Sequence, residues 1–79
     1  MVVIHREAGL RFVIFVNDHQ PAHVHVFGDG EAKVDLGSAR GEASLLSCVG
    51  LSDADLRRAL RIVADRRLEF LARWNAIHG

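Results

Sequence analysis

The chain has 79 residues, the size of one domain, and its ten Lys and Arg residues balance ten Asp and Glu residues. This balance excludes a general attraction to nucleic acids or acidic membranes, and no apolar run approaches the roughly twenty residues of a membrane-spanning helix. The single cysteine cannot form an internal disulfide, which is typical of a cytoplasmic protein. Hydrophobic residues make up 49% of the chain, more than a small monomer hides easily, so we expect a protein partner or a homo-oligomer.

Residues 2–49 have the pattern of an antiparallel sheet with four or five strands. The expected strands are residues 2–6, 10–16, 22–27 and 31–36, with a less regular candidate at 42–49. Residues 10–16 are apolar on both faces, which indicates a central strand. Loops are expected at residues 17–21 and 37–41, where turn-forming residues gather.

A Gly-Asp-Gly sequence marks a hairpin between the third and fourth expected strands. Charged and apolar side chains alternate along residues 31–36, so one face of this strand must point inward. Only a three-residue turn keeps the inward faces of both strands on the same side. That register places His23 opposite Asp35 and His25 opposite Lys33, with their side chains on the face away from the core.

Residues 53–77 are expected to form one long helix that packs across one face of the sheet, with Ser52 as the N-cap. Its apolar stripe consists of Leu56, Leu60, Val63, Phe70, Leu71, Trp74 and Ile77. Arg67 falls in the middle of this stripe, where a charged group needs a partner or a route to water. The sequence therefore predicts a single α+β domain over residues 1–79, with the sheet at 2–49.

Three of the five histidines stand within residues 17–26, whose sequence is Asn-Asp-His-Gln-Pro-Ala-His-Val-His-Val. His23 and His25 are two residues apart, so in a strand both rings leave the same face. Such a pair is a common arrangement of metal ligands, and His19 is a candidate third ligand for a divalent transition metal such as zinc. The carboxylates available to complete or orient this site are those of Asp18, Glu31 and Asp35.

The same histidines also fit two interpretations without a metal. One ring held by a carboxylate can act as a general base and a second as a general acid, which is enough to cleave RNA at its 2′-hydroxyl. In that hypothesis His19, His23 and His25 are catalytic and Asp35 orients His23. In the structural interpretation, His23 and His25 only face solvent and His19 braces the turn at Pro21.

Arg67 and Lys33 are candidate residues for binding a phosphate or substrate near the histidines. Both are cations expected close to the histidine-bearing strands. The alternative for Arg67 is a stem packed on the core with its head in water at the edge of the sheet.

Residues 17–26 resemble the hallmark of a small bacterial family, the domain of unknown function numbered 4160, whose usual form is Asn-Asp-His-x-Pro-Pro-His-Val-His-Val. Ala22 stands here in place of the second proline. Residues 30–33 are similar to the family's following strand, and residues 57–60 and 70–74 are similar to its closing helix. The resemblance covers nearly the whole chain.

The resemblance implies a protein partner rather than a particular reaction, because the activity of the family is not established. Its members are often encoded beside a second uncharacterised family, numbered 2442, in a layout like that of a toxin–antitoxin pair. The first hypothesis is therefore a cytoplasmic component of such a two-gene module that acts by binding its partner. The second is a small ribonuclease or metal-dependent hydrolase that uses the histidines, with RNA as a candidate substrate.

Overall fold

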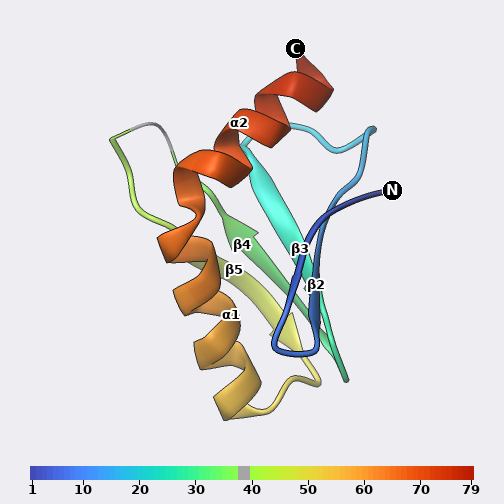
Figure 1. Ribbon diagram of the computed structural model, residues 1–79, viewed down its shortest axis with the longest axis vertical. Coiled ribbons are helices and arrows are strands. Elements are labelled where there is room, and N and C mark those ends of the chain that lie inside the picture. Colours follow the sequence, from blue (N-terminus) through green and yellow to red (C-terminus); the bar gives the residue numbers. More distant parts are fainter. Residues whose placement is uncertain (38–39) are drawn as a thin grey trace.

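An antiparallel sheet with two helices over one face makes up the described part of the chain, residues 1–37 and 40–79 of a computed structural model (Figure 1). Within these residues the sheet has five strands, each paired with its neighbours in sequence. They are β1 (Val2–Glu7), β2 (Leu10–Ile14), β3 (His23–Phe27), β4 (Glu31–Asp35) and β5 (Ser44–Val49). The predicted α+β class is confirmed, and so is the strand in the ambiguous segment 42–49. The predicted loop at 37–41 includes residues 38 and 39, which lie outside the described residues.

The register between β3 and β4 is the one that the alternation of side chains predicts. His23 pairs with Asp35 and His25 with Lys33, because the turn between the strands has three residues. In this turn the backbone N–H of Gly28 donates to the carbonyl of Gly30 at 3.0 Å. The register keeps the valines of both strands on the helix-covered face and sends both histidines to the opposite face.

The prediction of one long C-terminal helix is wrong, because the helix breaks at Arg66. Helix α1 (Asp53–Asp65) and helix α2 (Arg67–His78) meet there at a backbone conformation of φ −109° and ψ 16°. Figure 1 shows α2 leaving α1 at an angle and continuing past the end of the sheet where β3 begins. The predicted N-cap is confirmed, since the backbone N–H of Asp55 donates to the hydroxyl of Ser52 at 3.1 Å.

Two arginines at the break contact residues that are distant in the sequence. The Arg66 guanidinium lies 3.7 Å from the carboxylate of Glu7 on β1 and 3.1 Å from that of Glu69. The next side chain, Arg67, donates in another direction to the carbonyl of Leu36 at 3.0 Å. These two neighbouring arginines connect the junction to β1 and to the residue that follows β4.

The core fills the space between the helices and one face of the sheet. Helix α1 packs over β4 and β5, and α2 packs over β3. Phe12 of β2 contacts Phe70 of α2 with ring centroids 5.6 Å apart. The fully buried side chains include Trp74, Phe12, Phe70, Leu10, Ile14, Leu36, Val24, Val26, Val34 and Val63. Within the described residues, neither helix is long and apolar enough to cross a membrane.

Candidate metal centre

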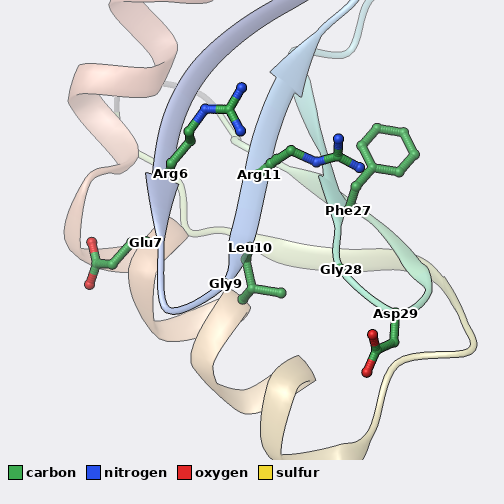
Figure 2. Close-up of a pocket in the computed structure, with 8 residues that line it drawn as sticks. All are labelled: Arg6, Glu7, Gly9, Leu10, Arg11, Phe27, Gly28 and Asp29. Carbon is green, nitrogen blue, oxygen red and sulfur yellow. The ribbon is translucent and has the colours of Figure 1, made fainter.

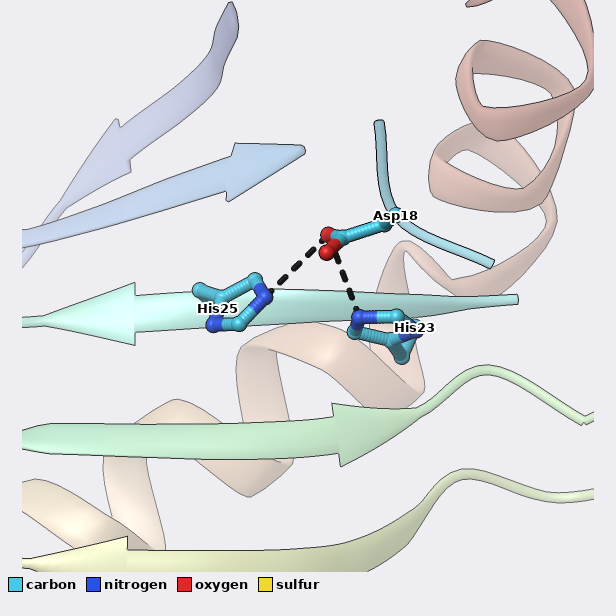
Figure 3. A group of neighbouring side chains, drawn as sticks. All are labelled: Asp18, His23 and His25. Carbon is cyan, nitrogen blue, oxygen red and sulfur yellow. Dashed lines mark hydrogen bonds and ion pairs between the residues drawn. The ribbon is translucent and has the colours of Figure 1, made fainter. Parts of the chain in front are cut away.

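Two strand residues and one loop residue converge on the face of the sheet opposite the helices. His23 and His25 come from β3, and the loop after β2 brings the carboxylate of Asp18 between their rings (Figure 3). One oxygen, Asp18 Oδ2, lies 3.2 Å from Nε2 of His23 and 3.2 Å from Nε2 of His25. The three side chains offer ligand atoms that all lie within 4.8 Å of one another. We call Asp18, His23 and His25 the histidine–aspartate group.

Backbone hydrogen bonds hold the loop that carries Asp18. The backbone N–H of Asp18 donates to the carbonyl of Phe15 at 3.1 Å, which closes a turn directly after β2. At the other end of the loop, the N–H of Leu36 donates to the carbonyl of Ala22 at 2.9 Å and extends the pairing of β3 and β4. The position of Asp18 is therefore fixed by backbone bonds at both ends of its loop.

A hydrogen bond to the backbone determines which nitrogen of His23 carries its proton. Nδ1 lies 2.8 Å from the carbonyl oxygen of Pro21, and because a carbonyl can only accept, Nδ1 is the donor. In the neutral ring Nε2 then carries a lone pair, and this lone pair faces the carboxylate of Asp18. Within the described residues Nε2 has no aligned hydrogen-bond partner, although it lies close to Asp18.

This arrangement leaves a buried acceptor facing another acceptor. His23 is only 4% exposed, so water does not compensate Nε2. A buried polar atom without a partner costs about 1–3 kcal/mol. A cation between Nε2 and the carboxylate would remove this cost. The ligand atoms of Asp18, His23 and His25 lie close enough together to hold such a cation.

His25 has a carboxylate near each ring nitrogen. Nε2 donates a hydrogen bond to Oδ2 of Asp18 at 3.2 Å, and Nδ1 lies 3.5 Å from the carboxylate of Glu31. A second carboxylate behind a ligating imidazole fixes its orientation and raises its basicity. The contact of Glu31 with His25 is longer than the hydrogen bond from His23 to the Pro21 carbonyl, and the Glu31 side chain is exposed. Both rings therefore direct Nε2 toward Asp18.

Aromatic side chains surround the group and lower the local dielectric. The Trp74 ring lies 5.1 Å from the His23 ring, and the edge of Phe15 contacts His25 at 4.8 Å between centroids. His78 stacks on Trp74 at 3.8 Å, and its Nε2 lies 3.2 Å from the carbonyl of Phe15. The end of α2 is thereby fastened to the loop that carries Asp18. The expectation of an open, solvent-facing pair of histidines does not hold for His23.

The predicted site residues are only partly brought together. His19 is exposed on the loop and lies outside the histidine–aspartate group. Asp35 faces His23 in the predicted register, but its carboxylate accepts the N–H of Gly37 at 2.6 Å and does not orient the ring. Lys33 is half-buried opposite His25, and Arg67 donates to the backbone of Leu36.

Asp18 takes the place expected for a third histidine. The sequence offered it as one of three carboxylates, but periodicity says nothing about how a loop folds back on a strand. The roles of Trp74 and of the Pro21 carbonyl were missed, because neither leaves a signal in the motif. Two imidazoles and one carboxylate form a donor set that suits Zn²⁺ or Fe²⁺ and leaves coordination positions for water or a substrate.

Comparison with known proteins places the chain in a family without giving it an activity. No curated protein and no solved structure is similar enough to match. One family model matches residues 9–75, a segment that includes the whole histidine–aspartate group, all of α1 and most of α2. The chain belongs to that family, which is described as a domain of unknown function (DUF4160).

Proposed function

We propose that the protein binds a divalent transition metal through Asp18, His23 and His25 and acts as a metal-dependent hydrolase. The observation that carries this proposal is the buried Nε2 of His23, which faces the Asp18 carboxylate without an aligned hydrogen bond. A bound zinc ion in such a site lowers the pKa of its water to about 7 and so supplies a nucleophile at neutral pH. The protein contributes oriented ligands, aromatic neighbours of both histidines and access from solvent, since Asp18 is 22% exposed.

The same geometry is the reason that we prefer a metal-dependent reaction to acid–base catalysis by the histidines alone. Catalysis of that kind needs one ring to hold a proton toward the substrate and the other to accept one. Here both rings direct Nε2 at the same carboxylate oxygen, so neither nitrogen is free for a substrate. The metal-free ribonuclease hypothesis therefore requires Asp18 to move away.

Calorimetric titration of the untagged protein with zinc tests the metal site. We expect about one equivalent to bind, and Asp18→Asn, His23→Gln and His25→Gln each to weaken binding by tenfold or more. His19→Gln is the matched control, because this histidine belongs to the same motif but is exposed and outside the group. Equal weakening by His19→Gln, or no binding to the parent protein, would contradict the proposal.

A second function, binding of a protein partner in a toxin–antitoxin-like module, is favoured by the edge strand β5. Among the strands of the described residues this strand pairs only with β4, and its side chains Leu46 and Val49 are 47% and 74% exposed. Residues 44–49 include no charged side chain, whereas the other edge strand, β1, carries Arg6 and Glu7. An apolar, uncharged edge is a template for pairing with another strand.

Co-expression with the adjacent gene product tests the partner function. The two proteins should elute together, and the double substitution Leu46→Lys with Val49→Lys should separate them while circular dichroism shows an unchanged fold. Growth and RNA integrity of cells with and without the adjacent gene then distinguish a toxin from an antitoxin. Co-elution that survives the double substitution would place the partner elsewhere on the surface.

A further inference from the structure

We propose that Arg6, Arg11 and Phe27 form a binding surface for a phosphate and its neighbouring base in a single-stranded nucleic acid. The three side chains lie on the same face of the sheet as the histidines, around a hollow of about 430 Å³ (Figure 2). Arg6 pairs directly with Arg11 across β1 and β2, and Arg11 pairs with Phe27 across β2 and β3. The arginines are exposed.

The charges on this surface are unbalanced. Two like charges directly opposite each other on neighbouring strands repel and destabilise a sheet. Within the described residues, neither guanidinium forms an ion pair with a carboxylate, and Arg11 instead lies 5.8 Å from the Phe27 ring centroid. A bound phosphate would relieve the repulsion, because guanidinium groups match its geometry and charge.

The two acidic residues at the rim do not neutralise the arginines. Figure 2 shows the carboxylates of Glu7 and Asp29 directed away from both guanidinium groups. Glu7 is engaged elsewhere, since it accepts a hydrogen bond from His5 at 2.8 Å and lies 3.7 Å from Arg66. The hydrogen bond from His5 is the main reason that the pKa of Glu7 lies below its ordinary value, and Arg66 adds to the lowering. The carboxylate therefore faces His5 and Arg66 and not the two arginines of this surface.

The aromatic ring connects this surface to the histidine–aspartate group. Phe27 follows His25 by two residues on β3, and the two rings are nearly parallel, at 10° with centroids 6.2 Å apart. Bases of single strands stack on aromatic rings whatever their sequence, while cations follow the phosphates. A strand held by the arginines and Phe27 would thus continue along β3 toward Asp18. That the bound strand is also the substrate rests on the proposed metal-dependent hydrolase.

Binding of a fluorescein-labelled oligouridine to the full-length protein tests the surface. Anisotropy is measured at low salt with a chelator present, so the result does not depend on the metal. We expect Arg6→Gln and Arg11→Gln each to weaken binding about fivefold and to lower the slope of log K against log salt by about 0.7. Phe27→Leu should weaken binding about tenfold through lost stacking.

Arg57→Gln is the matched control, because it removes the same charge from an exposed position on α1. Its affinity should stay within about twofold of the parent protein. The proposal is overturned if Arg57→Gln weakens binding as much as Arg11→Gln does, if the parent protein does not bind, or if inorganic phosphate at equal concentration displaces the oligonucleotide. Unchanged thermal melting of the variants excludes unfolding as the cause.

The same titration separates this inference from the metal centre. Asp18→Asn should bind oligouridine like the parent protein while losing zinc. If oligouridine binds and zinc does not, only the proposed hydrolase fails. If zinc binds and oligouridine does not, only the nucleic-acid surface fails.

Discussion

At the scale of single residues, the chemistry of the group depends on one hydrogen bond to the backbone. Because Nδ1 of His23 donates to the Pro21 carbonyl, Nε2 is the nitrogen left for a metal. Nitrogen-15 NMR of the metal-free protein should show a protonated Nδ1 on His23 that exchanges slowly with solvent. Addition of zinc should then shift the Nε2 resonance of both His23 and His25. An Nδ1 signal without a proton would contradict the assigned tautomer.

Trp74 is a second residue whose role depends on an unpaired atom. Its ring is buried, and within the described residues its Nε1 has no hydrogen-bond partner. Replacement by Phe removes the unpaired donor and keeps most of the packing, so we expect a loss of about 1–2 kcal/mol in the free energy of unfolding. Trp74→Ala should lose about 3–5 kcal/mol through the cavity. Urea unfolding followed by circular dichroism compares the two, and equal losses would contradict the expectation that packing of the ring supplies most of the stability.

At the scale of elements, the strands could be predicted and the connections between them could not. Alternation along residues 31–36 determines the register of β3 and β4, because a shift by one residue would put charged side chains in the core. The helix break at Arg66 carries no proline or glycine, so helical periodicity continued through it. At the break, Arg66 and Arg67 contact distant residues, Glu7 and Leu36, and helical periodicity does not reveal such contacts. The position of Asp18 was beyond prediction for the same reason, since loop geometry depends on backbone bonds.

The turn between β3 and β4 gives a prediction at this scale. A Cβ atom on Gly30 would lie 2.3 Å from the Val49 carbonyl oxygen and 2.3 Å from the carbonyl carbon of Gly50. Both are backbone atoms, so Gly30→Ala must push the end of β5 away and should lose about 1–3 kcal/mol of stability. Gly9→Ala meets no atom within 4 Å and should lose only the cost of its positive φ, about 1 kcal/mol. Denaturant unfolding measures both losses. A larger loss in Gly9→Ala than in Gly30→Ala would contradict the prediction that the close contact of Gly30 with the end of β5 matters for stability.

At the scale of the whole molecule, a metal ion should act as a stabilising ligand of a small domain. A 79-residue domain buries a modest fraction of its surface, so its stability without ligands is limited. At a zinc concentration about 100 times Kd, binding adds about 2.7 kcal/mol to the free energy of unfolding. For a domain of this size that raises Tm by roughly 10–20 °C. Calorimetric melts should show this rise in the parent protein and in His19→Gln but not in Asp18→Asn.

Anomalous diffraction from a crystal grown with zinc tests the central claim most directly. We predict one strong anomalous peak between Asp18, His23 and His25, with Nε2 of both rings and a carboxylate oxygen at about 2.0–2.2 Å from the ion. A zinc ion at His5, His19 or His78 instead, with no peak inside the histidine–aspartate group, would contradict the account.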